Sequence, residues 1–89
     1  MARFLVLTTF TSQEARLAHR AEHRVHLHAN ADAGKLLMAG PFVDETGGLI
    51  VFEAADEAEV QAIMDADPFS TNGVFDTVTI KPFNLVAGS

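Results

Sequence analysis

Residues 34–54, GKLLMAGPFVDETGGLIVFEA, decide the fold of this chain because they hold two strands joined by one short connection. The run KLLMAGPF predicts a strand that ends at Gly40 and Pro41, and LIVFEA predicts the strand that follows. Between them, VDETGG is rich in turn-forming residues and turns the chain.

On the upstream side, the sequence predicts a long helix over residues 12–33. Ser12 is a typical N-cap, and Gly34 supplies the left-handed stop. Apolar residues recur at helical spacing and fall within about a third of the circumference at ~100° per residue. We therefore expect the buried face of this helix to be formed by Leu17, Ala18, Ala21, Val25 and Ala29.

The remaining elements follow from similar signals. FLVL at residues 4–7 predicts a strand buried on both faces, because its apolar residues occur at both parities. Asp56 caps a second helix with the apolar stripe Val60, Ile63 and Met64, and Pro68 ends this helix near Ala66. A loop then leads to a last strand, VFDTVTIKPF, at residues 74–83.

The resulting order is β-α-β-β-α-β, the split βαβ arrangement of ferredoxin-like folds. We expect an α+β domain over residues 1–89, with a four-stranded antiparallel sheet and two helices on one face. The other face would be open to water, yet the first strand is apolar on both sides. A second copy that packs its sheet on this face would bury it, so we predict a homodimer.

Composition narrows the class of function. The chain has 89 residues, a net charge of −6, 48% hydrophobic residues and no cysteine. The acidic balance argues against nucleic-acid binding, and no run approaches the ~18 to 20 apolar residues of a membrane span. Without cysteine there is no disulfide framework, and a cytoplasmic location follows by default.

The segment RLAHRAEHRVHLH, residues 16–28, concentrates the ionisable nitrogen of this acidic chain. One interpretation is metal binding by His19, His23 and His26, although HExxH and cysteine ligands are missing. A second is a solvated polar face, in which Arg16, Arg20 and Arg24 form a basic ridge and His19, His26 and His28 simply face water. A third separates His23, which forms R-x-x-H with Arg20.

Several segments together resemble the YCII-related family. They are Arg20 and His23, GKLLMAGPF at residues 34–42, DADPF at 65–69 and GVFDTVTIKPF at 73–83. The resemblance implies a ferredoxin-like domain that dimerises through its sheets, similar to muconolactone isomerase and other dimeric α/β barrels. It also implies a His–Asp pair as the active site, here His23 and Asp67.

These residues suit acid–base chemistry. Imidazole is a side chain that can take and return a proton near neutrality, so His23 could do so, and a carboxylate bonded to one ring nitrogen would fix its tautomer and stabilise the imidazolium. Asp67 lies just past the second helix, so we expect its side chain to make no hydrogen bond within a helix. Arg20 could hold an anionic or enolate substrate oxygen.

The sequence contains no nucleophilic cysteine, no serine elbow, no phosphate-cradling glycine loop and no cofactor motif. We therefore predict isomerisation or elimination on a lactone, carbonyl or phenolic compound, without cofactor or metal. The alternative is a non-catalytic dimeric module that binds a small ligand. Each residue also has a structural interpretation: Asp67 before a proline is a common helix terminator, and Phe69 suits the core or a pocket wall.

Overall fold

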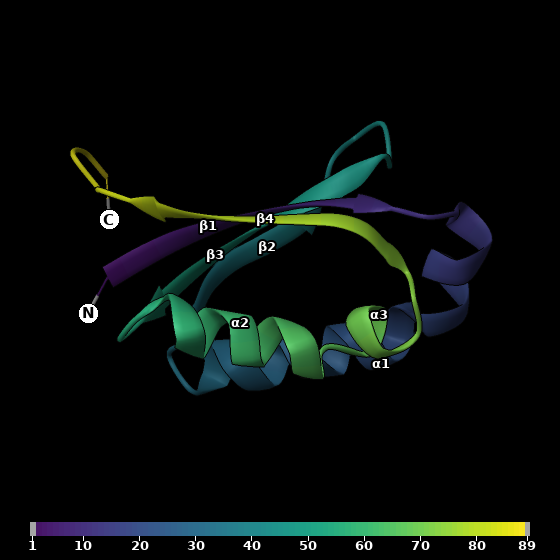
Figure 1. Cartoon of the computed structure of the whole chain (residues 1–89), viewed down its shortest axis with the longest axis horizontal. Helices are drawn as coiled ribbons and strands as arrows, with labels where there is room; N and C mark the ends of the chain where they lie inside the picture. Colours follow the sequence, from purple (N-terminus) through teal and green to yellow (C-terminus); the bar gives the residue numbers. More distant parts are fainter. Residues whose placement is uncertain (1, 89) are drawn as a thin grey trace.

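The computed structural model describes residues 2–88, which form one antiparallel sheet and three helices. The elements are β1 (Ala2–Phe10), α1 (Gln13–Asp32), β2 (Leu36–Pro41), β3 (Gly47–Ala54), α2 (Glu57–Ala66), α3 (Pro68–Thr71) and β4 (Phe75–Phe83). The strand order is β2-β3-β1-β4, and each neighbouring pair is antiparallel. Figure 1 shows the helices together on one side of the sheet. The predicted α+β ferredoxin-like fold is confirmed.

The helix boundaries follow the predicted caps. The Ser12 hydroxyl accepts a hydrogen bond from the Ala15 N–H at 3.1 Å, and Asp56 accepts one from the Glu59 N–H at 2.9 Å. After α1 the chain turns at Gly34, whose φ of 78° lies in the left-handed region that favours glycine. These local signals placed the ends of α1 and α2 correctly.

The short helix α3 was not predicted, since the sequence suggested a loop after Pro68. Proline fits the first position of a helix because its missing N–H would have no intrahelical partner there. The Asp67 carboxylate caps this turn by accepting from the Phe69 N–H at 2.9 Å. One proline thus ends α2 and begins α3.

The core lies between the sheet and α2. Phe4 and Val6 of β1 and Phe52 of β3 are at most 5% exposed, and Val60 and Met64 of α2 pack against them. Gly47 begins β3 where it crosses close to β1, and a Cβ at this position would overlap the Thr8 carbonyl oxygen.

The predicted buried face of α1 is wrong. Its five residues, Leu17, Ala18, Ala21, Val25 and Ala29, are all exposed, with Leu17 at 54% and Val25 at 71%. The face turned to the protein instead carries Arg16, which is 6% exposed, together with the half-buried His23 and Leu27. The predicted face consists mostly of alanine, whose side chain buries little apolar area. Ionisable groups can be buried where they find partners, so the apolar periodicity alone predicted the wrong face.

The opposite face of the sheet is apolar along β1 and β3, while β4 places Lys81 and Thr79 beside Leu5 and Leu7. No helix formed by residues 2–88 covers this face (Figure 1). Side chains alternate along a strand, so Leu5 and Leu7 point away from the face that holds the core. Leu5 pairs with Val51 and Leu7 with Leu49 on the neighbouring strand. Leu7 is 40% exposed. β1 is therefore apolar on both faces, but within this chain only the face toward the helices is buried, so the predicted burial of both faces is not seen here.

None of the helices formed by residues 2–88 combines the length and the apolar character needed to span a membrane.

Candidate active site

A cavity of about 460 Å³ lies between α1 and the sheet. Helix α1 contributes Arg20 and His23 to its wall, the strands contribute residues such as Ile50, and α3 contributes Phe69. This volume lies within the roughly 300–1,000 Å³ typical of small-molecule sites. The predicted substrate-binding residue Arg20 and the predicted acid–base residue His23 therefore share one pocket.

The structure brings His23 and Asp67 together from α1 and the α2–α3 junction. His23 Nδ1 lies 2.8 Å from Asp67 Oδ1 and 2.9 Å from Oδ2. The Asp67 side chain is 1% exposed and that of His23 is 14% exposed. A buried carboxylate of this kind holds the imidazole in one orientation and favours a proton on Nδ1.

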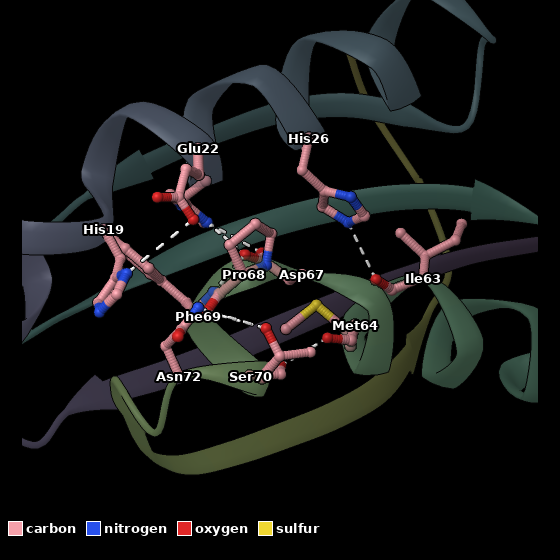
Figure 2. A network of polar contacts seen from close by, with 12 residues as sticks. His19, Glu22, His26, Ile63, Met64, Asp67, Pro68, Phe69, Ser70 and Asn72 are labelled. Carbon is pink, nitrogen blue, oxygen red and sulfur yellow. Dashed lines mark hydrogen bonds and ion pairs between the residues drawn. The ribbon is translucent and has the colours of Figure 1, made fainter.

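Asp67 has a second role, as the N-cap of α3, that the sequence did not reveal. We expected its side chain to be free of helix hydrogen bonds, but Oδ1 also accepts from the Phe69 N–H. Figure 2 shows Asp67 with Pro68 and Phe69 where the chain enters α3. The Phe69 N–H therefore holds the Asp67 carboxylate through a contact that does not involve His23.

Aromatic rings fix the plane of the imidazole. The His23 ring stacks on Phe69 with centroids 3.7 Å apart and an interplanar angle of 3°. Phe75 meets His23 and Phe69 edge-on, at 6.2 and 5.5 Å. The predicted place of Phe69 in the core or pocket wall is confirmed, since it is 1% exposed and lines the cavity. Its stacking on His23 was not foreseen, because residues 23 and 69 are far apart in the chain.

Arg16 is the residue that sequence reasoning misjudged most. We expected a solvated ridge, but Arg16 is 6% exposed and lines the cavity. Its Nη1 donates to Gln13 Oε1 at 3.0 Å and lies 3.5 Å from Glu45 Oε1. The guanidinium also lies 5.3 Å from the centroid of the Phe10 ring. Glu45 is 29 residues away in the chain, so charge patterning within the helix could not identify this counter-charge.

The loop between β2 and β3 has its own polar contacts. Asp44 accepts hydrogen bonds from the Thr46 hydroxyl at 2.7 Å and the Thr46 N–H at 3.1 Å. These bonds hold the pKa of Asp44 below its usual value, with the hydroxyl as the larger cause. The next residue, Glu45, has a φ of 63°, which is unusual for a residue other than glycine.

The other three histidines of α1 make different contacts. His26 Nε2 lies 3.0 Å from the Ile63 carbonyl oxygen and ties α1 to α2 (Figure 2). This corrects the prediction that His26 only faces water. His19 Nδ1 lies 4.0 Å from a Glu22 oxygen, and His28 is exposed at the cavity wall. Residues 2–88 contain no group of three or more His, Cys, Asp or Glu that could hold a metal ion.

Comparison with known proteins gives the family. Residues 2–84 match the YCII-related domain. The chain belongs to the YCII-related family.

Two relatives match this chain over most of their own length. Protein YciI of Escherichia coli O6:H1 is 38% identical over 85 residues, which cover 84% of this chain and 87% of the relative. Uncharacterized protein YjpA of Bacillus subtilis is 36% identical over 85 residues, with 96% and 98% covered. The family resemblance predicted from short motifs therefore extends along nearly the whole domain.

A solved structure has the same fold as this chain. It is 5-chloro-2-hydroxyhydroquinone dehydrochlorinase (TftG) from Burkholderia phenoliruptrix AC1100, in complex with 2,5-dihydroxybenzoquinone. The TM-score is 0.83 at 24% identity, over 92% of this chain and 93% of that one. At this level of identity, the likeness describes the fold.

Proposed function

We propose that this YCII-related protein is a small-molecule enzyme in which His23 is the general acid and base and Asp67 orients it. The proposal rests on one observation: His23 lines the cavity, and its Nδ1 lies 2.8 and 2.9 Å from the two carboxylate oxygens of the buried Asp67. A carboxylate that accepts a hydrogen bond from the Nδ1–H keeps the ring proton on Nδ1 and leaves the lone pair of Nε2 for the substrate.

The proposed reaction is an isomerisation or an elimination on a lactone, carbonyl or phenolic compound. In an elimination, His23 Nε2 would take a proton from the substrate and the leaving group would depart with the electrons of its bond. Asp67 would stabilise the imidazolium formed in this step. Arg20, one turn earlier on α1, would stabilise the oxyanion that develops on the substrate.

The structural neighbour supports the elimination branch of this proposal. Its name describes a dehydrochlorinase that acts on a chlorinated hydroxyhydroquinone, and this reaction removes HCl from a phenolic ring. We extend the reaction class to this chain as part of the proposal. A ligand-binding module without catalysis is the competing function, and it predicts binding of the same probes without turnover.

The test measures chloride release from 5-chloro-2-hydroxyhydroquinone under nitrogen, and isomerisation of muconolactone by absorbance. We expect turnover by the wild type, and a loss of about 10²- to 10⁴-fold in His23→Gln. His19→Gln is the matched control, because it makes the same change one turn away at a residue outside the cavity lining. Binding of both probes without turnover would favour the binding module, and equal rates of turnover in wild type and His23→Gln would contradict the role of His23.

We also propose that the uncovered face of the sheet is the interface of a homodimer of the residue 1–89 domain. Leu5, Leu7, Leu49 and Val51 form its centre, with Met38 on β2 beside Val51 and 58% exposed. An apolar surface of this kind is stabilised when a second copy removes it from water. An ion pair between Arg3 and Glu53 at 3.6 Å lies farther along the same two strands.

A further inference from the structure

The charge of this protein is distributed unevenly around the candidate site. The chain has six Lys and Arg residues against twelve Asp and Glu. Three of the six, Arg16, Arg20 and Arg24, line the cavity between α1 and the sheet, together with His23 and His28. Among the residues that line this cavity there is no Asp or Glu. A pocket with cationic walls in an acidic protein indicates a negatively charged occupant.

The cationic residues form a regular row. Arg16, Arg20, Arg24 and His28 are spaced four residues apart, so they succeed one another on the same side of α1. Arg16 has a counter-charge, since its Nη1 lies 3.5 Å from Glu45 Oε1. Within residues 2–88, no ion pair is found for Arg20 or Arg24. These two guanidinium groups are therefore free to bind an anion.

The remaining wall of the cavity is mostly apolar. Leu36, Ala39 and Ile50 line it from the strands, and Phe69 lines it beside His23. This wall would not accommodate a hydrated inorganic ion well, because the ion would lose water without gaining partners there. It suits the hydrocarbon body of a small organic molecule. The two walls together favour a ligand with one charged edge and one apolar body.

We propose that the substrate is a small organic anion, whose carboxylate or acidic enol oxygens are held by Arg20 and Arg24 while its apolar body rests against the strands. Planar guanidinium groups bind pairs of oxygen atoms through two parallel hydrogen bonds. His23 lines the same cavity as these two arginines, so a substrate held by both would lie in the pocket where His23 can exchange a proton with it. This inference rests on the proposed function and names its substrate class.

The experiment is calorimetric titration of the full-length protein with 2,5-dihydroxybenzoquinone, which is anionic at neutral pH, and with its neutral dimethyl ether. We expect the anion to bind at least about tenfold more tightly than the ether, which corresponds to one charge-assisted hydrogen bond. Arg20→Gln and Arg24→Gln should each weaken the anion by about 10- to 100-fold and leave the ether unchanged. Arg20→Lys keeps the charge and should retain part of the affinity.

Lys35→Gln is the matched control, because it removes one positive charge outside the cavity, where Lys35 lies 3.2 Å from Glu59. Equal affinity for the anion and the ether would overturn the proposal, as would an equal loss in Lys35→Gln and Arg20→Gln. Neither result would contradict the proposed function, which is tested separately by the turnover rates of the wild type and His23→Gln. Conversely, selective binding of the anion without turnover would support the anion-binding role of Arg20 and Arg24 and contradict the proposed catalytic function.

Discussion

Replacing Asp67 by Asn tests whether the carboxylate sets the position of the proton on His23, because the two side chains have nearly the same shape. The Asp67 side chain is 1% exposed, and its oxygens lie 2.8 and 2.9 Å from His23 Nδ1. An ionised carboxylate accepts hydrogen bonds and donates none. In the wild type, neutral His23 is therefore expected to carry its proton on Nδ1 and to keep a lone pair on Nε2.

The expected magnitudes follow from the contacts that the substitution changes. The asparagine oxygen can still accept the Phe69 N–H, but its NH₂ group would point a donor at Nδ1 and move the ring proton to Nε2. Exchanging a charge-assisted hydrogen bond for a neutral one should lower the free energy of unfolding by about 1 to 2 kcal/mol. The rate should fall much further, by about 10²- to 10⁴-fold, because Nε2 can no longer accept a proton.

Three measurements separate these effects. Nitrogen-15 NMR of the ring nitrogens reports the tautomer of His23, urea unfolding reports the stability, and chloride release reports the rate. Asp65→Asn is the matched control, since Asp65 is exposed and accepts a hydrogen bond from Gln61 at 2.8 Å. The reasoning is refuted if Asp67→Asn has the tautomer and the rate of Asp65→Asn, or if its rate falls only in proportion to the unfolded fraction.

Gly47→Ala should lower the free energy of unfolding by about 3 kcal/mol, because the added Cβ overlaps the backbone of β1; an unchanged urea midpoint would contradict this. Leu7→Lys should turn the proposed dimer into a monomer in light scattering, since it places a charge in the apolar interface. Val25→Lys, on the exposed face of α1, should leave the mass unchanged, and a monomeric wild type would end the dimer proposal. Thr46→Val removes a hydroxyl that donates to Asp44, so an NMR titration should show the pKa of Asp44 rising toward its usual value. Because this pKa is lowered by folding, the bonds stabilise the fold above the usual pKa of Asp, and this contribution is lost as the pH falls through the lowered value. A titration curve that Thr46→Val leaves unchanged would show that the hydroxyl is not the main cause.

Local signals predicted the architecture well. Ser12, Gly34 and Asp56 act on backbone groups within a few residues, so their effect on the helix ends can be foreseen from neighbours in the chain. The same short range explains why Pro68 ends α2 where predicted. The missed helix α3 is short enough that a turn and a helix have nearly the same local sequence.

The candidate site was only partly predictable. His23 and Asp67 were proposed as a pair from the family resemblance, and the structure shows the distance between them. The catalytic role of the pair stays a prediction. The buried Arg16 and the ring stacked on His23 were not foreseen, because their partners come from segments that meet only in the folded chain.

Apart from the short helix α3, the sequence by itself determined the order of the elements, the ferredoxin-like topology and the family, because periodicity, caps and motifs are properties of neighbouring residues. Tertiary structure alone decided which face of α1 is buried. The alanine-rich face had the apolar pattern, yet the arginine and histidine face lies toward the protein. The buried polar groups on that face are satisfied by partners such as Glu45 and Asp67, which lie in other elements. A hydrogen bond between residues far apart in the chain leaves no periodic trace in the sequence.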